Sequence, residues 1–128
     1  MVVHIYDVPY ITPMDPLELF KQLSDTTRLR CLALMSSAGE LCVCELTHAL
    51  DLSQPKISRH LAQLRESGVV QSRRAGHWVH YRIHEDLPAW AARVIQAMQA
   101  GMEKKKPYCT DLKVLKDMPN RPGATCCA

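Results

Sequence analysis

Two cysteines separated by one residue are the most reactive feature of this sequence. Cys42 and Cys44 form a C-x-C motif, and the other four cysteines are Cys31, Cys109, Cys126 and Cys127. A secreted disulfide scaffold would spread its cysteines through a loop-rich chain, and these are unevenly placed. In a reducing compartment such residues act as thiols, ligands or redox groups. The C-x-C pair is therefore a candidate site for a soft ion.

The spacing of the pair sets a geometric condition on that chemistry. Residues two apart on an α-helix point to opposite sides, whereas in an extended segment they share a face. Cys42 and Cys44 are therefore expected to clamp one centre only if the helix start that follows Leu41 is unwound or distorted. A helix start also lowers a thiol pKa, which favours thiolate. The alternative is that both are small buried hydrophobic residues.

A second group of polar residues predicts contact with DNA. The segment SQPKISRHL at residues 53–61 places hydrogen-bonding side chains at the start of a helix, where a recognition helix meets the major groove. The expected contacts in it are Gln54, Lys56, Ser58, Arg59 and His60. A basic hairpin tip would add Arg73, Arg74 and His77 beside the backbone. The alternative is an ordinary solvated helix face.

The elements that must position these residues follow from capping and periodicity. Helices are expected over residues 15–23, 25–38, 44–50, 53–67 and 87–102, with strands over 69–73 and 78–83. The fold class is mainly α: a winged helix-turn-helix with a two-stranded β-hairpin wing. Residues 1–14 are expected to be an N-terminal arm, 15–102 the DNA-binding and dimerisation domain, and 103–128 a flexible tail.

The last predicted helix carries an apolar stripe that predicts a dimer. With Leu17 of the first helix, its residues Trp90, Val94, Ile95 and Met98 are the expected interface. Two recognition helices would then reach half-sites about one turn of DNA apart. The expected partners are a second copy of the chain and double-stranded operator DNA.

Composition narrows the class of protein further. The chain of 128 residues suits one domain, and its net charge of +3 barely indicates a polyanion partner by itself. No signal peptide or membrane-spanning run is evident, so we expect a cytoplasmic protein without a membrane partner. No nucleophile signature or phosphate-binding glycine loop occurs, so we do not expect an enzyme.

Three motifs in order resemble the ArsR/SmtB metalloregulators, and within them the repressors of arsenical resistance operons. They are ELCVCEL at 40–46, SQPKISRHL at 53–61 and GHWVHYR at 76–82, and the similarity spans about residues 17–100. The resemblance implies a homodimeric repressor that requires no cofactor. It further implies that As(III) or Sb(III), bound by thiolates at Cys42 and Cys44, induces release from DNA.

The sequence departs from the family pattern at one position. Many of these repressors carry a third cysteine three residues after the second, and Thr47 stands there. A hydroxyl is a poor ligand for a soft centre. A third ligand would have to be Cys109, Cys126 or Cys127, a small external thiol, or water. A sensor of another soft metal ion and a thiol-redox regulator remain as alternatives.

Overall fold

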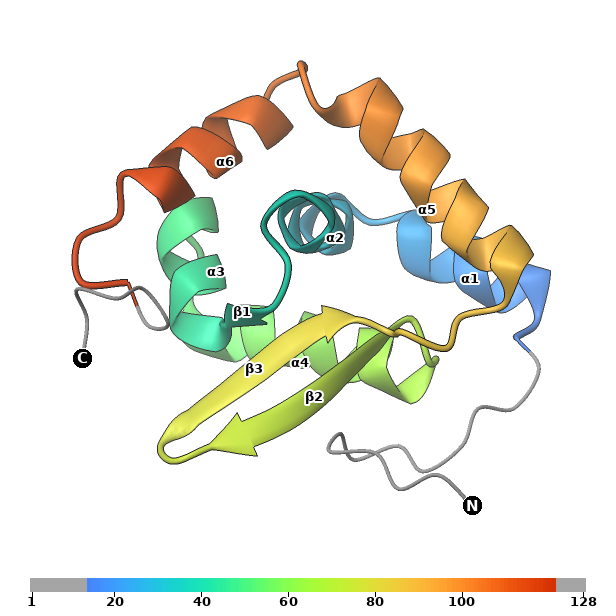
Figure 1. Ribbon diagram of the computed structural model, residues 1–128, viewed down its shortest axis with the longest axis horizontal. Helices are drawn as coiled ribbons and strands as arrows, with labels where there is room; N and C mark the ends of the chain where they lie inside the picture. Colours follow the sequence, from blue (N-terminus) through green and yellow to red (C-terminus); the bar gives the residue numbers. More distant parts are fainter. Residues whose placement is uncertain (1–13, 122–128) are drawn as a thin grey trace.

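The computed structural model describes residues 14–121, which form six helices and a three-stranded sheet. The predicted mainly α winged helix-turn-helix is confirmed (Figure 1). The elements are α1 Pro16–Leu23, α2 Thr26–Ala38, β1 Leu41–Cys42, α3 Val43–Leu50, α4 Gln54–Glu66, β2 Val70–Ala75, β3 Trp78–Ile83, α5 Ala89–Met102 and α6 Tyr108–Lys116. The predicted arm up to residue 13, together with Cys126 and Cys127, lies outside the described residues.

Side-chain caps fix where three of the helices begin. Asp15 accepts a hydrogen bond from the Leu17 N–H at the start of α1, and Asp25 accepts one from the Arg28 N–H in α2. Ser53 does the same for α4 through the Lys56 N–H. Each cap satisfies a backbone donor that has no partner within its helix. These caps were predictable from the residue types alone.

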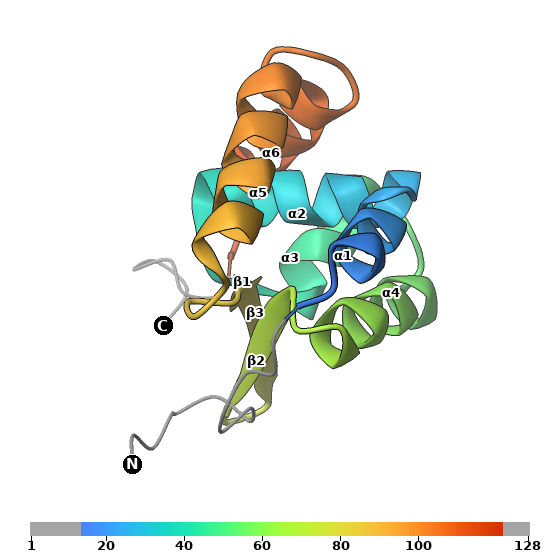
Figure 2. The ribbon, with the colours of Figure 1, turned by 90° about the vertical axis from the view of Figure 1, so that its right-hand side faces the viewer.

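Helix α2 lies at the centre of the molecule, and the other elements surround it (Figure 1). Cys31, Leu32 and Leu34 of this helix are fully or almost fully buried. Cys31 is therefore a core residue, as its helical spacing among leucines predicts. The turned view shows α4 and the sheet below α2, α5 crossing one end of α2 and rising above it, and α6 above α2 (Figure 2).

The wing has three strands where the sequence predicts two. Strand β1 pairs antiparallel with β3, so the sheet order is β1-β3-β2. The pairing places Leu41 opposite Tyr81 and Cys42 opposite His80. A strand of two residues carries too little periodicity to be recognised in a sequence, and only its long-range partner defines it. The C-x-C segment is thereby part of the wing sheet.

The prediction of a flexible tail over residues 103–128 is wrong for its first half. Helix α6 packs against α2 and α3, and its Leu115 is fully buried. Arg30 of α2 donates two hydrogen bonds of 2.8 Å to the carboxylate of Asp111, which is 3% exposed. The apolar pattern of α6 is short and follows a run of lysines, so it does not stand out in the sequence. The helix is held in place by a buried ion pair to a residue that is distant in the sequence.

No helix within residues 14–121 is long and apolar enough to cross a membrane.

Removing the buried carboxylate tests whether α6 docks as described. Asp111→Ala leaves the Arg30 guanidinium, whose side chain is 19% exposed, without its partner. Breaking a buried pair in this way costs about 3 kcal/mol, so the urea midpoint should fall at a fixed protein concentration. Asp117→Ala, at an exposed position just after α6, is the control and should leave the midpoint in place. Equal midpoints for the two variants would contradict the docking of α6.

Candidate thiol site and nucleic-acid interface

Cys42 is the N-cap of α3, and this position determines the geometry of the thiol pair. Its backbone is extended, with φ −80° and ψ 154°. Its sulfur accepts a hydrogen bond from the Cys44 N–H at 3.3 Å, and its own N–H donates to Glu45 Oε1 at 2.8 Å. The two bonds form a capping box in which a thiol replaces the usual hydroxyl. The side chain of Cys42 therefore folds over the first turn of the helix.

The two sulfurs are already neighbours while the helix is intact. The Sγ atoms of Cys42 and Cys44 are 2.7 Å apart, and both residues are free thiols. The expectation that only an unwound helix start could bring them together is wrong. The rule for residues two apart applies inside a helix, and Cys42 lies outside it as the cap. The pair forms a preformed two-sulfur site, with Cys42 buried and Cys44 half-buried.

The pKa of Cys44 also differs from the sequence prediction. Burial, the hydrogen bond with Cys42 and the nearby Cys42 sulfur raise the pKa of Cys44 to about 12. The helix start was expected to lower it, but desolvation outweighs the helix dipole here. Cys44 is therefore a neutral thiol at neutral pH before any ligand binds.

Within the described residues the pair has no third soft ligand. The Thr47 hydroxyl donates to the Val43 carbonyl oxygen at 2.8 Å, so it serves the helix backbone. Among residues 14–121, no group of three His, Cys, Asp or Glu side chains is placed to hold a metal ion. The half-buried Cys109, on the first turn of α6, is thus not brought to the pair within one chain. The other two candidates, Cys126 and Cys127, lie outside the described residues.

Most of the predicted DNA-reading residues lie on the open side of α4. Gln54 and Arg59 are exposed, and Lys56 and Ser58 are half-buried. Gln54 Nε2 donates to Ser58 Oγ at 2.6 Å, which aligns the two side chains along the helix. The opposite side of α4, formed by Ile57, Leu61 and Leu64, is fully buried. The helix is therefore anchored on one face and polar on the other.

His60 does not share that polar face, which corrects the sequence prediction. It is 9% exposed, and its Nδ1 lies 3.2 Å from Arg28 Nη1 and 3.7 Å from Asp25 Oδ2. It lies three residues after Ile57 and therefore on the buried side of the helix. Burial lowers the pKa of His60 below its usual 6.5, against the attraction of Asp25. Its contacts connect α4 to α2.

The wing presents fewer free cations than expected. Arg74 and His77 are exposed, so both are available for the predicted backbone contacts. Arg73 instead makes a bidentate ion pair with Glu40, with its Nε 2.9 Å from Oε2. The same carboxylate lies 4.0 Å from His80. The wing is therefore tied to the residue that precedes β1. Trp78 on β3 is 46% exposed, a feature that sequence reasoning did not single out.

The predicted dimer face is only partly available on the surface. Leu17 is 76% exposed, and Phe20 beside it on α1, which the sequence prediction omitted, is 53% exposed. Trp90, Val94 and Met98 are half-buried against the core. Ile95 is 3% exposed inside the single chain, so its assignment to the interface is corrected. Both α1 and α5 still offer apolar surface to a second copy.

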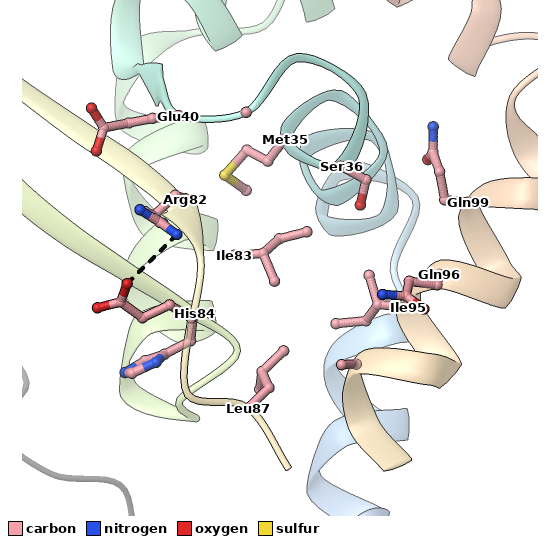
Figure 3. A pocket seen from close by; sticks show the side chains of 13 residues that line it. Met35, Ser36, Glu40, Arg82, Ile83, His84, Leu87, Ile95, Gln96 and Gln99 are labelled. Atoms are coloured by element: carbon pink, nitrogen blue, oxygen red, sulfur yellow. Dashed lines mark ion pairs between the residues drawn. The ribbon is translucent and has the colours of Figure 1, made fainter. Parts of the chain in front are cut away.

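A pocket of about 630 Å³ lies between α2, the end of β3 and α5 (Figure 3). Met35, Ile83 and Ile95 supply apolar lining, and Arg82 forms an ion pair of 3.7 Å with Glu85 at one side. The described residues that line this pocket include no cysteine. It is therefore separate from the thiol pair, although Glu40 borders it.

A winged helix-turn-helix with a polar recognition helix and a thiol pair beside it defines a DNA-binding transcriptional regulator with a thiol site. Residues 25–72 match the model of the bacterial regulatory proteins of the arsR family. The chain is 48% identical over 112 residues to the arsenic resistance transcriptional regulator ArsR1 of Pseudomonas putida, covering 87% of this chain and 88% of that protein. It therefore belongs to the ArsR family.

Other relatives agree with this assignment. The arsenical resistance operon repressor of Escherichia coli is 58% identical over 98 residues, which cover 76% of this chain and 84% of that repressor. The crystal structure of the AntR antimony-specific transcriptional repressor superposes with a TM-score of 0.58 at 30% identity, covering 68% of this chain and 76% of AntR. A homodimeric winged helix-turn-helix domain from Mycobacterium bovis superposes with a TM-score of 0.56 at 28% identity. The superposition covers 70% of this chain and 83% of that domain.

The buried position of His60 predicts a pH dependence of stability. Its folded-state pKa lies below 6.5, so the unfolded chain takes up the proton at a higher pH than the folded chain does. The free energy of unfolding should therefore fall as the pH drops through about 6.5, and His60→Gln should remove part of that fall. Urea midpoints at about pH 7.5 and about pH 5.5 measure the difference. His77→Gln, at an exposed position of the wing, should lose as much stability between these pH values as the wild type does. An equally large loss in His60→Gln would show that His60 is not the residue responsible.

Proposed function

We propose that this protein is a cytoplasmic homodimeric repressor of an arsenic-resistance operon, and that trivalent arsenic or antimony bound at Cys42 and Cys44 releases it from operator DNA. The observation that carries the proposal is the preformed sulfur pair, 2.7 Å apart, at the junction of the wing sheet and the helix that precedes α4. The arsenic-resistance names of the relatives and the homodimeric neighbour support it.

The chemistry of capture suits neutral thiols. Dissolved arsenite at neutral pH is the uncharged arsenous acid, As(OH)₃. Each Cys–S–H that reacts forms one As–S bond, and its proton leaves with one hydroxyl group as water. No oxidant or reductant takes part, and no net proton is released. The raised pKa of Cys44 therefore does not oppose binding, and soft sulfur donors favour the metalloid over hard cations.

DNA binding is assigned to the open face of α4 and to the wing. Gln54 and Arg59 can form bidentate hydrogen bonds with base edges, while Lys56 and Ser58 suit phosphate oxygens. The exposed Arg74 and His77 would contact the backbone next to the helix. The apolar residues Leu17 and Phe20 of α1 would join α5 in the dimer, which sets the spacing of the two recognition helices.

One route from the thiols to DNA runs through the turn between α3 and α4. Helix α3 ends at Leu50, and Asp51 follows in the left-handed conformation with φ 55°. Only Leu52 and Ser53 separate Asp51 from the start of α4. Because α3 also packs along α4, a shift at the capped end of α3 changes the tilt of the recognition helix.

A second route runs through the sheet into the wing. Cys42 pairs with His80 of β3, and the adjacent Glu40 holds Arg73 of β2. Metalloid bound to Cys42 would pull on the N-cap and on β1 together. The wing and the recognition helix would then move relative to one another, which disrupts a surface that must fit both groove and backbone. We assign the coupling to these two routes together.

Operator binding by fluorescence anisotropy tests the function. Arsenite should weaken operator binding of the wild type by about 10- to 100-fold, and Cys42→Ser/Cys44→Ser should abolish this response. Cys109→Ser is the matched control and should respond as the wild type does. A phosphine reductant without thiol groups, present throughout, removes disulfide formation as a cause. Full release of the double variant by arsenite would refute the assignment of the sensor.

The second route is tested by separating ligand binding from release. Glu40→Gln removes the charge that holds Arg73 but leaves both thiols in place. Arsenite affinity should stay close to the wild type, while the factor by which arsenite weakens operator binding should shrink by about threefold to tenfold. Glu85→Gln, which removes the charge that pairs with Arg82, is the control. An unchanged factor in Glu40→Gln would exclude the wing route.

A further inference from the structure

The carboxylate of Glu45 holds the backbone of Cys42 in place. Its Oε1 accepts a hydrogen bond of 2.8 Å from the Cys42 N–H, and its Oε2 accepts one of 2.5 Å from Arg121 Nε. The Glu45 side chain is 2% exposed, so solvent does not compete for these contacts. Each contact also stabilises the buried charge, because desolvation makes an unpartnered carboxylate costly. Glu45 is therefore fixed in position, and it fixes the position of Cys42 in turn.

Three contacts together restrain the sulfur of Cys42. Glu45 binds its N–H, its backbone pairs with His80 of β3, and its Sγ accepts the Cys44 N–H at 3.3 Å. Cys42 is also buried, so neighbouring atoms limit its movement. The 2.7 Å separation of the Sγ atoms of Cys42 and Cys44, which we call the bite of the thiol pair, is therefore set by the fold. The bite can widen only if these contacts loosen.

The bite suits some soft centres better than others. A bond between sulfur and a soft centre is about 2.3 Å long, and trivalent arsenic forms pyramidal bonds at roughly right angles, so its two sulfurs lie about 3.3 Å apart. Ag(I), which is also soft, prefers two sulfurs in a line, and this arrangement needs about 4.6 Å. The bite must therefore widen by about 0.6 Å for arsenic but by about 1.9 Å for silver. The larger movement strains the contact between Cys42 and Glu45 far more than the smaller one does.

We propose that Glu45 sets the ligand selectivity of the thiol pair, because it holds the bite at a width that favours a pyramidal metalloid over a linear thiophilic cation. This inference rests on the proposed function and concerns the same site. Glu45 is a positioning residue, since it acts through the Cys42 N–H. Among residues 14–121 no three His, Cys, Asp or Glu side chains are placed to hold a metal ion, so its carboxylate is not arranged as a third ligand.

Both ligands bind without any change in oxidation state. On arsenous acid the two thiol protons leave with two hydroxyl groups as water, and two As–S bonds form. On Ag(I) two Ag–S bonds form, and the two thiol protons pass to the buffer. The two ligands therefore use the same two sulfur atoms and differ in the angle between their bonds, which makes them a matched pair of probes for the bite.

The ratio of silver affinity to arsenite affinity tests the role of Glu45. Both affinities are measured by titration without DNA, in a parent variant with serine at the three other cysteines outside the core, Cys109, Cys126 and Cys127. Glu45→Ala should raise the ratio by about tenfold, because it removes the acceptor of the Cys42 N–H. Glu45→Gln keeps an acceptor on a side chain of the same length and should stay within about twofold of the parent ratio. The parent ratio in folded Glu45→Ala would overturn the inference.

Two further variants distinguish positioning from a general structural role. The exposed Glu66→Ala, at the end of α4, is the matched control and should leave the ratio unchanged. A general loss of stability would weaken both ligands alike and also leave the ratio in place. Arg121→Ala removes the partner of the far oxygen of Glu45, so the ratio should rise by about threefold. Arg121 is 28% exposed, so this variant decides the question if Glu45→Ala does not fold, and the parent ratio in it would then overturn the inference.

The same proteins separate this inference from the proposed function. Release of the wild type from its operator by arsenite, together with the parent ratio in Glu45→Ala, would overturn the role of Glu45 and leave the function standing. No release of the wild type by arsenite would overturn the function, whereas the affinity ratio, measured without DNA, would still decide the role of Glu45.

Discussion

The structure depends on one residue that ends a strand and caps a helix. Cys42 pairs with His80 in the wing sheet, donates its N–H to Glu45, and folds its thiol over the first turn of α3. A serine or aspartate would cap as well, but only a thiol can both cap the helix and bind a soft centre. A ligand on this sulfur therefore competes with the cap and acts on the helix and the sheet simultaneously.

Three carboxylates connect this junction to the rest of the chain through arginines distant in sequence. Glu45 binds Arg121, Asp111 binds Arg30, and Glu40 binds Arg73. Breaking such a pair at a buried position is costly, although the intact pair adds little stability over an apolar contact. These pairs instead fix positions: they hold the segment that ends at Arg121, helix α6 and the wing in place relative to α3. The thiol pair is thus surrounded by contacts that can change when a ligand binds to it.

Local chemistry explains what the sequence could predict. Capping residues and helical periodicity predicted most of the helices and strands, and the C-x-C motif predicted the thiol site. The position of His60 was also encoded, because with Ile57, Leu61 and Leu64 it completes the buried spacing, but its polarity favoured the open face. The pairing of β1, the docking of α6 and the raised pKa of Cys44 arise from contacts between distant segments, and no local pattern specifies them.

Operator binding and metalloid binding at the thiol pair are thermodynamically linked in the mechanism that we propose. Linkage requires each ligand to weaken the other by the same factor. Arsenite affinity measured with and without saturating operator DNA tests this directly. Operator DNA should lower the arsenite affinity by the same factor by which arsenite lowers the operator affinity. An arsenite affinity unchanged by operator DNA would contradict it, since the thiol pair and the DNA surface would then be independent.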